Sequence, residues 1–307
     1  AQDLRLSIRG FGARSAFGIR GIKLVVDGIP ETTPDGQGQL DNLPLGLLQN
    51  IEVLRGPSAL RYGNAAGGVV AIETINDVAK EFHNIGIRVG SFDFTQLNYT
   101  GGINNDKTQL ILHLNHNKGK GYRNHSQFEN NQFNAKLKHK LSPSSKFVFQ
   151  FNATNSPFAA DAGGQNLEEL SSNRRAARER NLTFNAGEKI NHLKAGTSFS
   201  YEKNKLSIQS YGFVANRDFQ GLLPFSNGGW VELNRAFSGH GSLLTYTLAK
   251  NGIESKTQLG YSLSFQNDSR DRFINSNGTK GEATLKQNER FLAVGSYLIE
   301  QLTYKKW

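Results

Sequence analysis

The residues in this sequence that could carry out a reaction do not form a recognisable catalytic pattern. The 307 residues include no cysteine, which excludes disulfides, thiolate metal sites and cysteine nucleophiles. His113 and His116 lie three positions apart in a run that we predict to be a strand, so they point to opposite faces and cannot share a metal. The GFG at 10–12 begins a dinucleotide-binding pattern, but Ser15 occupies the position of the third glycine. We therefore predict no enzyme, no catalytic residue, no metal site and no cofactor.

Basic side chains offer a binding chemistry instead. Residues 1–77 hold 7 Lys and Arg against 8 Asp and Glu, whereas residues 78–307 hold 29 against 18, so the whole positive excess lies in the second region. Within it, Lys136, Lys138 and Lys140 alternate with apolar residues and share one face of a predicted strand. These lysines could guide an anionic ligand, bind carboxylates of another part of the chain, or form a hydrated wall.

The second region alternates apolar and polar residues over long segments. Phe147, Phe149 and Phe151 fall on one face of their segment, and the same alternation runs through 193–201 and 259–265. The opposite faces carry small or hydrated residues, so each face meets a different solvent, which is typical of transmembrane β-strands. The mean hydropathy of −0.50 is compatible with such alternation, and no run reaches the ~18 apolar residues of a membrane helix.

The connections between these segments also alternate in length. We predict about ten strands, near 82–90, 93–104, 108–118, 131–141, 146–155, 190–202, 205–218, 235–249, 253–272 and 290–304. Short turns are predicted at 104–107, 142–145, 202–205 and 249–252. Longer loops are predicted at 119–130, 156–189, 219–234 and 273–289. Short turns at one end and long loops at the other are typical of outer-membrane barrels, in which the short turns are periplasmic. A soluble β-sandwich gives no reason for this alternation.

The most specific signal lies in the Gly-rich first region. The segment IEVLRGPSALRYGNAAGGVVAIET at 51–74 follows IRGFG at 8–12 and VDGIP at 26–30. In this order and spacing, the three segments resemble the plug domain of TonB-dependent outer-membrane receptors, over residues 4–75. The resemblance implies a mainly β protein with two units. These are a small mixed α/β plug domain at 1–77, truncated at its N-terminus, and a partial antiparallel transmembrane β-barrel at 78–307.

The strand count adds an expectation about length. Barrels that enclose a plug have about 22 strands, so about ten strands predict a fragment of a longer protein. The implied location is the outer membrane of a Gram-negative bacterium, in contact with its lipid and lipopolysaccharide. In the loop at 156–189 the charges nearly cancel, so no nucleic-acid site is predicted.

The resemblance also implies roles for individual residues. Arginines at the positions of Arg9 and Arg55 pair with barrel-wall glutamates and lock the plug in the lumen, although the sequence does not identify those glutamates. Two plug loops are the candidate ligand-binding elements, and their candidate residues are Arg14, Ser15, Phe17, Asp35, Gln37 and Gln39. Arg14 could pair with an anionic chelate, Phe17 could stack on a ligand, and the other residues could form hydrogen bonds.

The function that the resemblance implies is active import. A ferric siderophore or a similar metal chelate would bind from outside, and the energy-coupling protein TonB would then rearrange the plug. Cobalamin, haem and oligosaccharide are alternative ligands, and a passive receptor or adhesin is an alternative role. Haem is less favoured, because residues 1–77 contain no histidine that could serve as an axial ligand.

Overall fold

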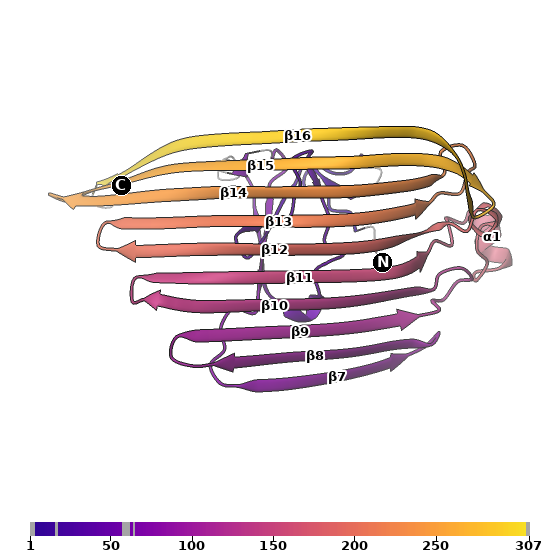
Figure 1. Ribbon diagram of the computed structural model, residues 1–307, viewed down its shortest axis with the longest axis horizontal. Helices are drawn as coiled ribbons and strands as arrows, with labels where there is room; N and C mark the ends of the chain where they lie inside the picture. The colour runs from indigo at the N-terminus through magenta and orange to yellow at the C-terminus, as the bar shows by residue number, and fades with distance from the viewer. Residues whose placement is uncertain (1–3, 16–17, 57–61, 64, 305–307) are drawn as a thin grey trace.

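The computed structural model describes residues 4–15, 18–56, 62–63 and 65–304. Its largest feature is one ten-stranded antiparallel sheet, which we call the wall, with its strands in sequence order from β7 to β16 (Figure 1). The wall strands are β7 (Phe82–Gly90), β8 (Phe94–Asn104), β9 (Thr108–Gly119), β10 (Phe128–Ser142), β11 (Ser145–Ala160), β12 (Gly187–Lys203), β13 (Leu206–Leu222), β14 (Trp230–Lys250), β15 (Ile253–Ser276) and β16 (Thr279–Tyr304). The predicted mainly β fold is confirmed.

The short turns of the wall lie where the alternation predicted them. The turn between β14 and β15 consists of Asn251 and Gly252, whose φ angles of 54° and 77° are those of a two-residue type I′ hairpin. Connections at 120–127, 161–186 and 223–229 are longer and lie at the opposite end. The predicted loop at 273–289 is wrong, because β15 and β16 pair up to Ser276 and Thr279 around a second type I′ turn at Asn277 and Gly278.

The longest loop is ordered by side-chain contacts. It contains two short helices, α1 (Leu167–Ser172) and α2 (Glu179–Thr183), and α1 marks the long-loop end of the wall in Figure 1. Asn166 and Glu169 form a reciprocal capping box at the start of α1. From the neighbouring loop, Arg123 donates hydrogen bonds to the carbonyls of Ala162, Gly163 and Ala176. The two loops therefore form one packed cap.

The two faces of the wall differ as the alternation predicted. Leu193 on β12 and Leu263 on β15 point outward and are 53% and 45% exposed, whereas His192 and Lys194, on either side of Leu193, are buried on the inner face. No helix among the described residues is long and apolar enough to cross a membrane.

The N-terminal unit, the predicted plug, lies against the inner face of the wall. Four strands form its main sheet in the order β3-β2-β6-β5, with β2 and β6 parallel. The elements are β1 (Ile19–Arg20), β2 (Lys23–Val26), β3 (Ile29–Pro30), β4 (Gln37–Gly38), the 3₁₀ turn η1 (Leu45–Leu47), β5 (Leu48–Leu54) and β6 (Val69–Thr74). Ile19, Ile22, Leu24, Val70 and Ile72 form its core. The domain boundary at residue 77 falls between β6 and β7 and stays a prediction.

Candidate functional site at the plug–wall interface

Positive charges of the wall meet negative charges of the plug. Five inward-pointing basic residues on four wall strands each form an ion pair with a carboxylate of residues 27–77; the pairs are Lys136–Asp27, Lys138–Asp77, Lys194–Glu31, Arg217–Asp41 and Arg235–Asp35. Three roles were open for the lysines of β10. In the structure, Lys136 and Lys138 bind plug carboxylates, while Lys140 is exposed. These five basic residues of the second region thus neutralise individual carboxylates of the plug.

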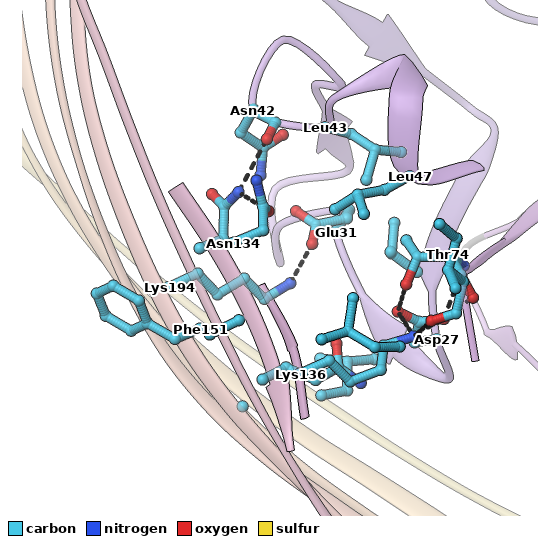
Figure 2. Close-up of a pocket in the computed structure, with 18 residues that line it drawn as sticks. Asp27, Glu31, Asn42, Leu43, Leu47, Thr74, Asn134, Lys136, Phe151 and Lys194 are labelled. Atoms are coloured by element: carbon cyan, nitrogen blue, oxygen red, sulfur yellow. Dashed lines mark hydrogen bonds and ion pairs between the residues drawn. The ribbon is translucent and has the colours of Figure 1, made fainter. Parts of the chain in front are cut away.

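Lys136 and Asp27 form the ion pair nearest to β6. The Nζ atom lies 2.8 Å from Asp27 Oδ2, and both side chains are nearly buried. Asp27 also accepts hydrogen bonds from the backbone N–H and the hydroxyl of Thr74, as Figure 2 shows. A buried charge is tolerated only when it is paired and hydrogen-bonded, and this carboxylate meets both conditions. The end of β6 is therefore connected to wall strand β10 through Asp27 and Lys136.

Lys194 holds the hairpin that β2 and β3 form. Its Nζ atom lies 2.5 Å from Glu31 Oε1 and donates to the carbonyl of Pro30 at 2.8 Å (Figure 2). The same ammonium lies 4.9 Å from the ring centroid of Phe213, a cation–π contact. Beside it, Ile29 packs against Phe213, and a Cβ on Gly196 would come within 2.6 Å of Ile29 Cδ1. Gly196 therefore makes room for the tip of this hairpin.

A small cavity lies between these two ion pairs. It has a volume of about 70 Å³ and is lined by plug and wall residues, which Figure 2 draws as sticks. Asn152 donates to Asn134 Oδ1 and to the carbonyl of Asn42. The remaining amide atoms, Asn134 Nδ2 and Asn152 Oδ1, are buried without a partner among the described residues. Such a cavity has room for ordered water, which buried polar atoms recruit.

One register level of the wall carries polar residues on most of its strands. We call it the cross-wall row: Asn115, Gln132, Thr154, His192, Arg217, Arg235 and Asp268 lie directly opposite one another from β9 to β15. Asp41 of the plug spans part of this row. Its carboxylate binds Arg217 at 2.5 and 3.1 Å, and its carbonyl accepts from Gln132 at 3.1 Å. Through Asp41, the plug therefore contacts two strands of the wall, β10 and β13, at this register level.

Arg235 connects the second candidate ligand loop to the wall. Its guanidinium binds Asp268 on β15 at 2.7 Å and Asp35 of the loop at 3.3 Å, and it donates to Gln37 Oε1 at 3.2 Å. Asp268 is fully buried. The backbone N–H of Asp35 donates to Gln266, which in turn donates to Asp268. Loop and wall therefore share one hydrogen-bond network.

These contacts favour the charged forms of two plug carboxylates, Asp35 and Asp77. Burial alone would raise the pKa of Asp35, but the charge of Arg235 and hydrogen bonds from Thr33 and Gln37, with Arg20, lower it below its ordinary value. A hydrogen bond from Lys138 and the charge of that lysine lower the pKa of Asp77. Both carboxylates are therefore ionised at neutral pH.

The predicted ligand residues occupy different environments. Asp35 and Gln37 are directed into the wall network, whereas Arg14 is exposed. Ser15 closes a turn through its N–H to the carbonyl of Gly12, and Gln39 is partly buried with its Oε1 unpartnered among the described residues. Phe17 lies outside the described residues. Ligand contact by this set stays a prediction.

The two predicted locking arginines lie away from these pairs. Arg9 sits in a turn with a φ of 52°, and both Arg9 and Arg55 are exposed. Within the part of the chain that the structure describes, neither forms an ion pair with a wall carboxylate. Their role in locking the plug stays a prediction.

Sequence reasoning missed Lys194, Arg217 and Arg235. Lys194 occupies the polar face of an alternating segment, and that is the signal that could have found it. Arg217 and Arg235 share their inner faces with the buried rings of Phe213 and Phe237, so alternation alone does not identify them. The arrangement attaches the plug to the wall through ion pairs and hydrogen bonds. Within residues 4–15, 18–56, 62–63 and 65–304, no group of three or more His, Asp or Glu side chains could hold a metal ion.

Comparisons with known proteins agree with this architecture. Residues 1–69 match the family model described as the TonB-dependent receptor plug domain. A hemin receptor of Yersinia pestis is 40% identical over 78 residues, which are 24% of this chain and 12% of that protein. The ferric enterobactin receptor of Pseudomonas aeruginosa is 34% identical over 95 residues, which are 27% of this chain and 12% of that protein.

A solved structure extends the likeness to the wall. The unliganded ferric citrate transporter FecA superposes with a TM-score of 0.77 at 18% identity, over 99% of this chain and 52% of that one. The chain thus spans about half the length of that transporter, with the same fold. Plug signature, wall topology and plug–wall contacts agree, and the chain belongs to the TonB-dependent receptor family of the Gram-negative outer membrane.

Proposed function

We propose that this protein imports a scarce ligand, a ferric siderophore, across the outer membrane with energy supplied through TonB. The observation that carries the proposal is the polar attachment of the plug. Ion pairs and amide contacts hold the plug against the wall at several heights, from Asp77 to Asp35. Water can replace contacts of this kind when the plug moves, whereas a continuous apolar interface would resist displacement.

The choice of a ferric siderophore rests on chemistry and on relatives. Arg14 and Arg20 are exposed beside the candidate loops and could pair with an anionic chelate. Among the similar proteins, the Pseudomonas aeruginosa relative is named a ferric enterobactin receptor. A passive receptor or adhesin would not need a plug held by replaceable contacts.

Haem is a second candidate ligand, because the Yersinia pestis relative is named a hemin receptor. His125 is a histidine of the long-loop end. Its Nε2 lies 2.7 Å from the carbonyl of Ala186, which leaves Nδ1 as the nitrogen that could face a ligand. If haem is the ligand, His125→Ala should weaken its binding and change its absorption spectrum.

Calorimetry on the full-length protein tests the proposal, with ferric siderophores, haem and cobalamin as separate titrants. Tight binding of one ferric chelate, weakened by Arg14→Ala and unchanged by the control Lys203→Ala at the short-turn end, is the expected result. Uptake of radioactive iron should then depend on TonB. Binding of none of these ligands by the folded protein would overturn the proposal in favour of a passive receptor.

A further inference from the structure

The outward face of the wall changes abruptly from apolar to amide side chains. On β10, β11, β12 and β15, the mainly apolar outward positions end at an asparagine on the long-loop side; these residues are Asn131, Asn155, Asn191 and Asn267. On β12, for example, the outward positions from Leu193 to Tyr201 cover a segment of nine residues. Asn191 is the next outward position on the long-loop side. This length matches the ~9–11 residues of a membrane-spanning strand. The asparagines therefore lie at the outer boundary of the lipid-facing band.

Three of these asparagines and His116 of β9 form a hydrogen-bonded ladder across β9 to β12. His116 Nδ1 lies 2.6 Å from Asn131 Oδ1, Asn131 donates to Asn155 at 3.4 Å, and Asn155 donates to Asn191 at 2.6 Å. Each residue is the direct register partner of the next. The ladder holds these side chains in fixed positions and still leaves amide donors and acceptors for other partners.

An open groove of about 870 Å³ straddles this boundary. Its polar half contains the ladder, including Asn155 and Asn191, and its apolar half contains Leu114 and Leu193. These two leucines are about half exposed, so no other part of the described chain covers them. A groove with one apolar half and one amide half fits an amphiphile whose headgroup lies on the long-loop side.

We propose that this groove binds one lipopolysaccharide molecule of the outer leaflet. Amides donate to and accept from sugar hydroxyls and phosphates, which such a headgroup presents in number. Lys118 and Lys189 are exposed on the outward face, two residues beyond His116 and Asn191 toward the loops, where phosphates would lie. The acyl chains cover the leucines. The proposal rests on the outer-membrane location and not on the identity of the imported ligand.

The test measures lipopolysaccharide bound to the full-length protein in detergent. The amount retained on purification would be determined by mass spectrometry, and affinity by titration with purified lipopolysaccharide. The variant is Asn155→Leu with Asn191→Leu, which makes the polar half apolar. Asn267→Leu is the matched control, because Asn267 lies at the same boundary but does not line the groove. Asn191→Asp is a milder variant that keeps a polar side chain and repels phosphate.

We expect the double variant and Asn191→Asp to bind lipopolysaccharide about tenfold more weakly, the effect of losing one or two hydrogen bonds. The control should bind it as the unchanged protein does. Equal retention in all variants would overturn the proposal, as would equal affinity for phosphatidylglycerol micelles. A dimer that the double variant abolishes would also overturn it and assign the groove to a second copy. Calorimetry with the imported ligand should give the same affinity in every variant, so failure here is separable from failure of the proposed function.

Discussion

Arg217 of β13 and Asp41 of the plug form a two-bond ion pair in which both side chains are less than one-tenth exposed. Removing one partner of such a pair leaves an unpaired buried charge. Arg217→Leu should therefore weaken plug attachment by about 3–5 kcal/mol, and adding Asp41→Asn should recover part of the loss. The readout is thiol labelling of Ala215→Cys, a wall position buried next to Ile29, as urea is increased. Additive effects of the two changes would contradict direct coupling.

Two lysines of one strand give a matched comparison of burial. Lys136 and Asp27 are 8% and 11% exposed, whereas Asp77, the partner of Lys138, is 76% exposed. Lys136→Met should cost about 3–5 kcal/mol, because Asp27 loses its buried counter-charge. Lys138→Met should cost no more than about 1 kcal/mol, because solvent screens its partner. The same labelling assay measures both changes, and equal losses would show that burial does not determine them.

Acid should loosen the second candidate loop. The pKa of Asp35 is lowered in the folded protein, so its contribution to stability is complete above the ordinary value of about 3.9 and is lost as the pH falls through the lower folded value. We expect loop attachment to weaken as the pH falls below about 4, with a smaller pH dependence in Asp35→Asn. Urea titrations at several pH values measure this difference. An unchanged pH profile in the variant would assign the acid sensitivity to other carboxylates.

Gly196 provides a steric test of the hairpin contact. Its added Cβ would lie 2.6 Å from Ile29 Cδ1, so Gly196→Ala should weaken plug attachment by about 1–3 kcal/mol. Ile29→Val should partly relieve this effect. Gly212→Ala is the control on the next strand, where the nearest atom to a Cβ would lie 3.8 Å away. If alanine weakened plug attachment equally at both glycines, the cause would be a change in strand conformation and not a clash with the β2–β3 hairpin.

The sequence was sufficient to predict the strands of the wall, because the side-chain pattern of each strand depends on the solvent that its two faces meet. In residues 193–201 and 259–265, apolar side chains alternate with small or polar ones. That pattern predicts the face that each side chain occupies, and constrains how neighbouring strands pair, without tertiary information. The turn at Asn277 and Gly278 could also have been predicted, since Asn-Gly is a strong hairpin signal. The polar residues around it favoured a loop instead, and that prediction was wrong.

The plug–wall pairs could not be predicted in the same way. Asp41 and Arg217 lie 176 positions apart, and only the position of the plug within the wall brings them together. Lys136 was identified as an inward charge, but the sequence left open whether it would meet a ligand or a carboxylate. For Asp35, the resemblance to plug domains suggested a ligand contact, and the structure adds a connection to Arg235 that competes for the same side chain.

The polar attachment of the plug also has a calorimetric consequence. Heat capacity rises when apolar surface is hydrated and falls when polar surface is hydrated. Withdrawing the plug would expose Lys136, Glu31, Asp41 and Arg235 together with the few apolar contacts around Ile29. The two contributions oppose each other, so the enthalpy of withdrawal should vary little with temperature. Unfolding of the plug core around Ile19 and Leu24 should instead show a large positive heat-capacity change.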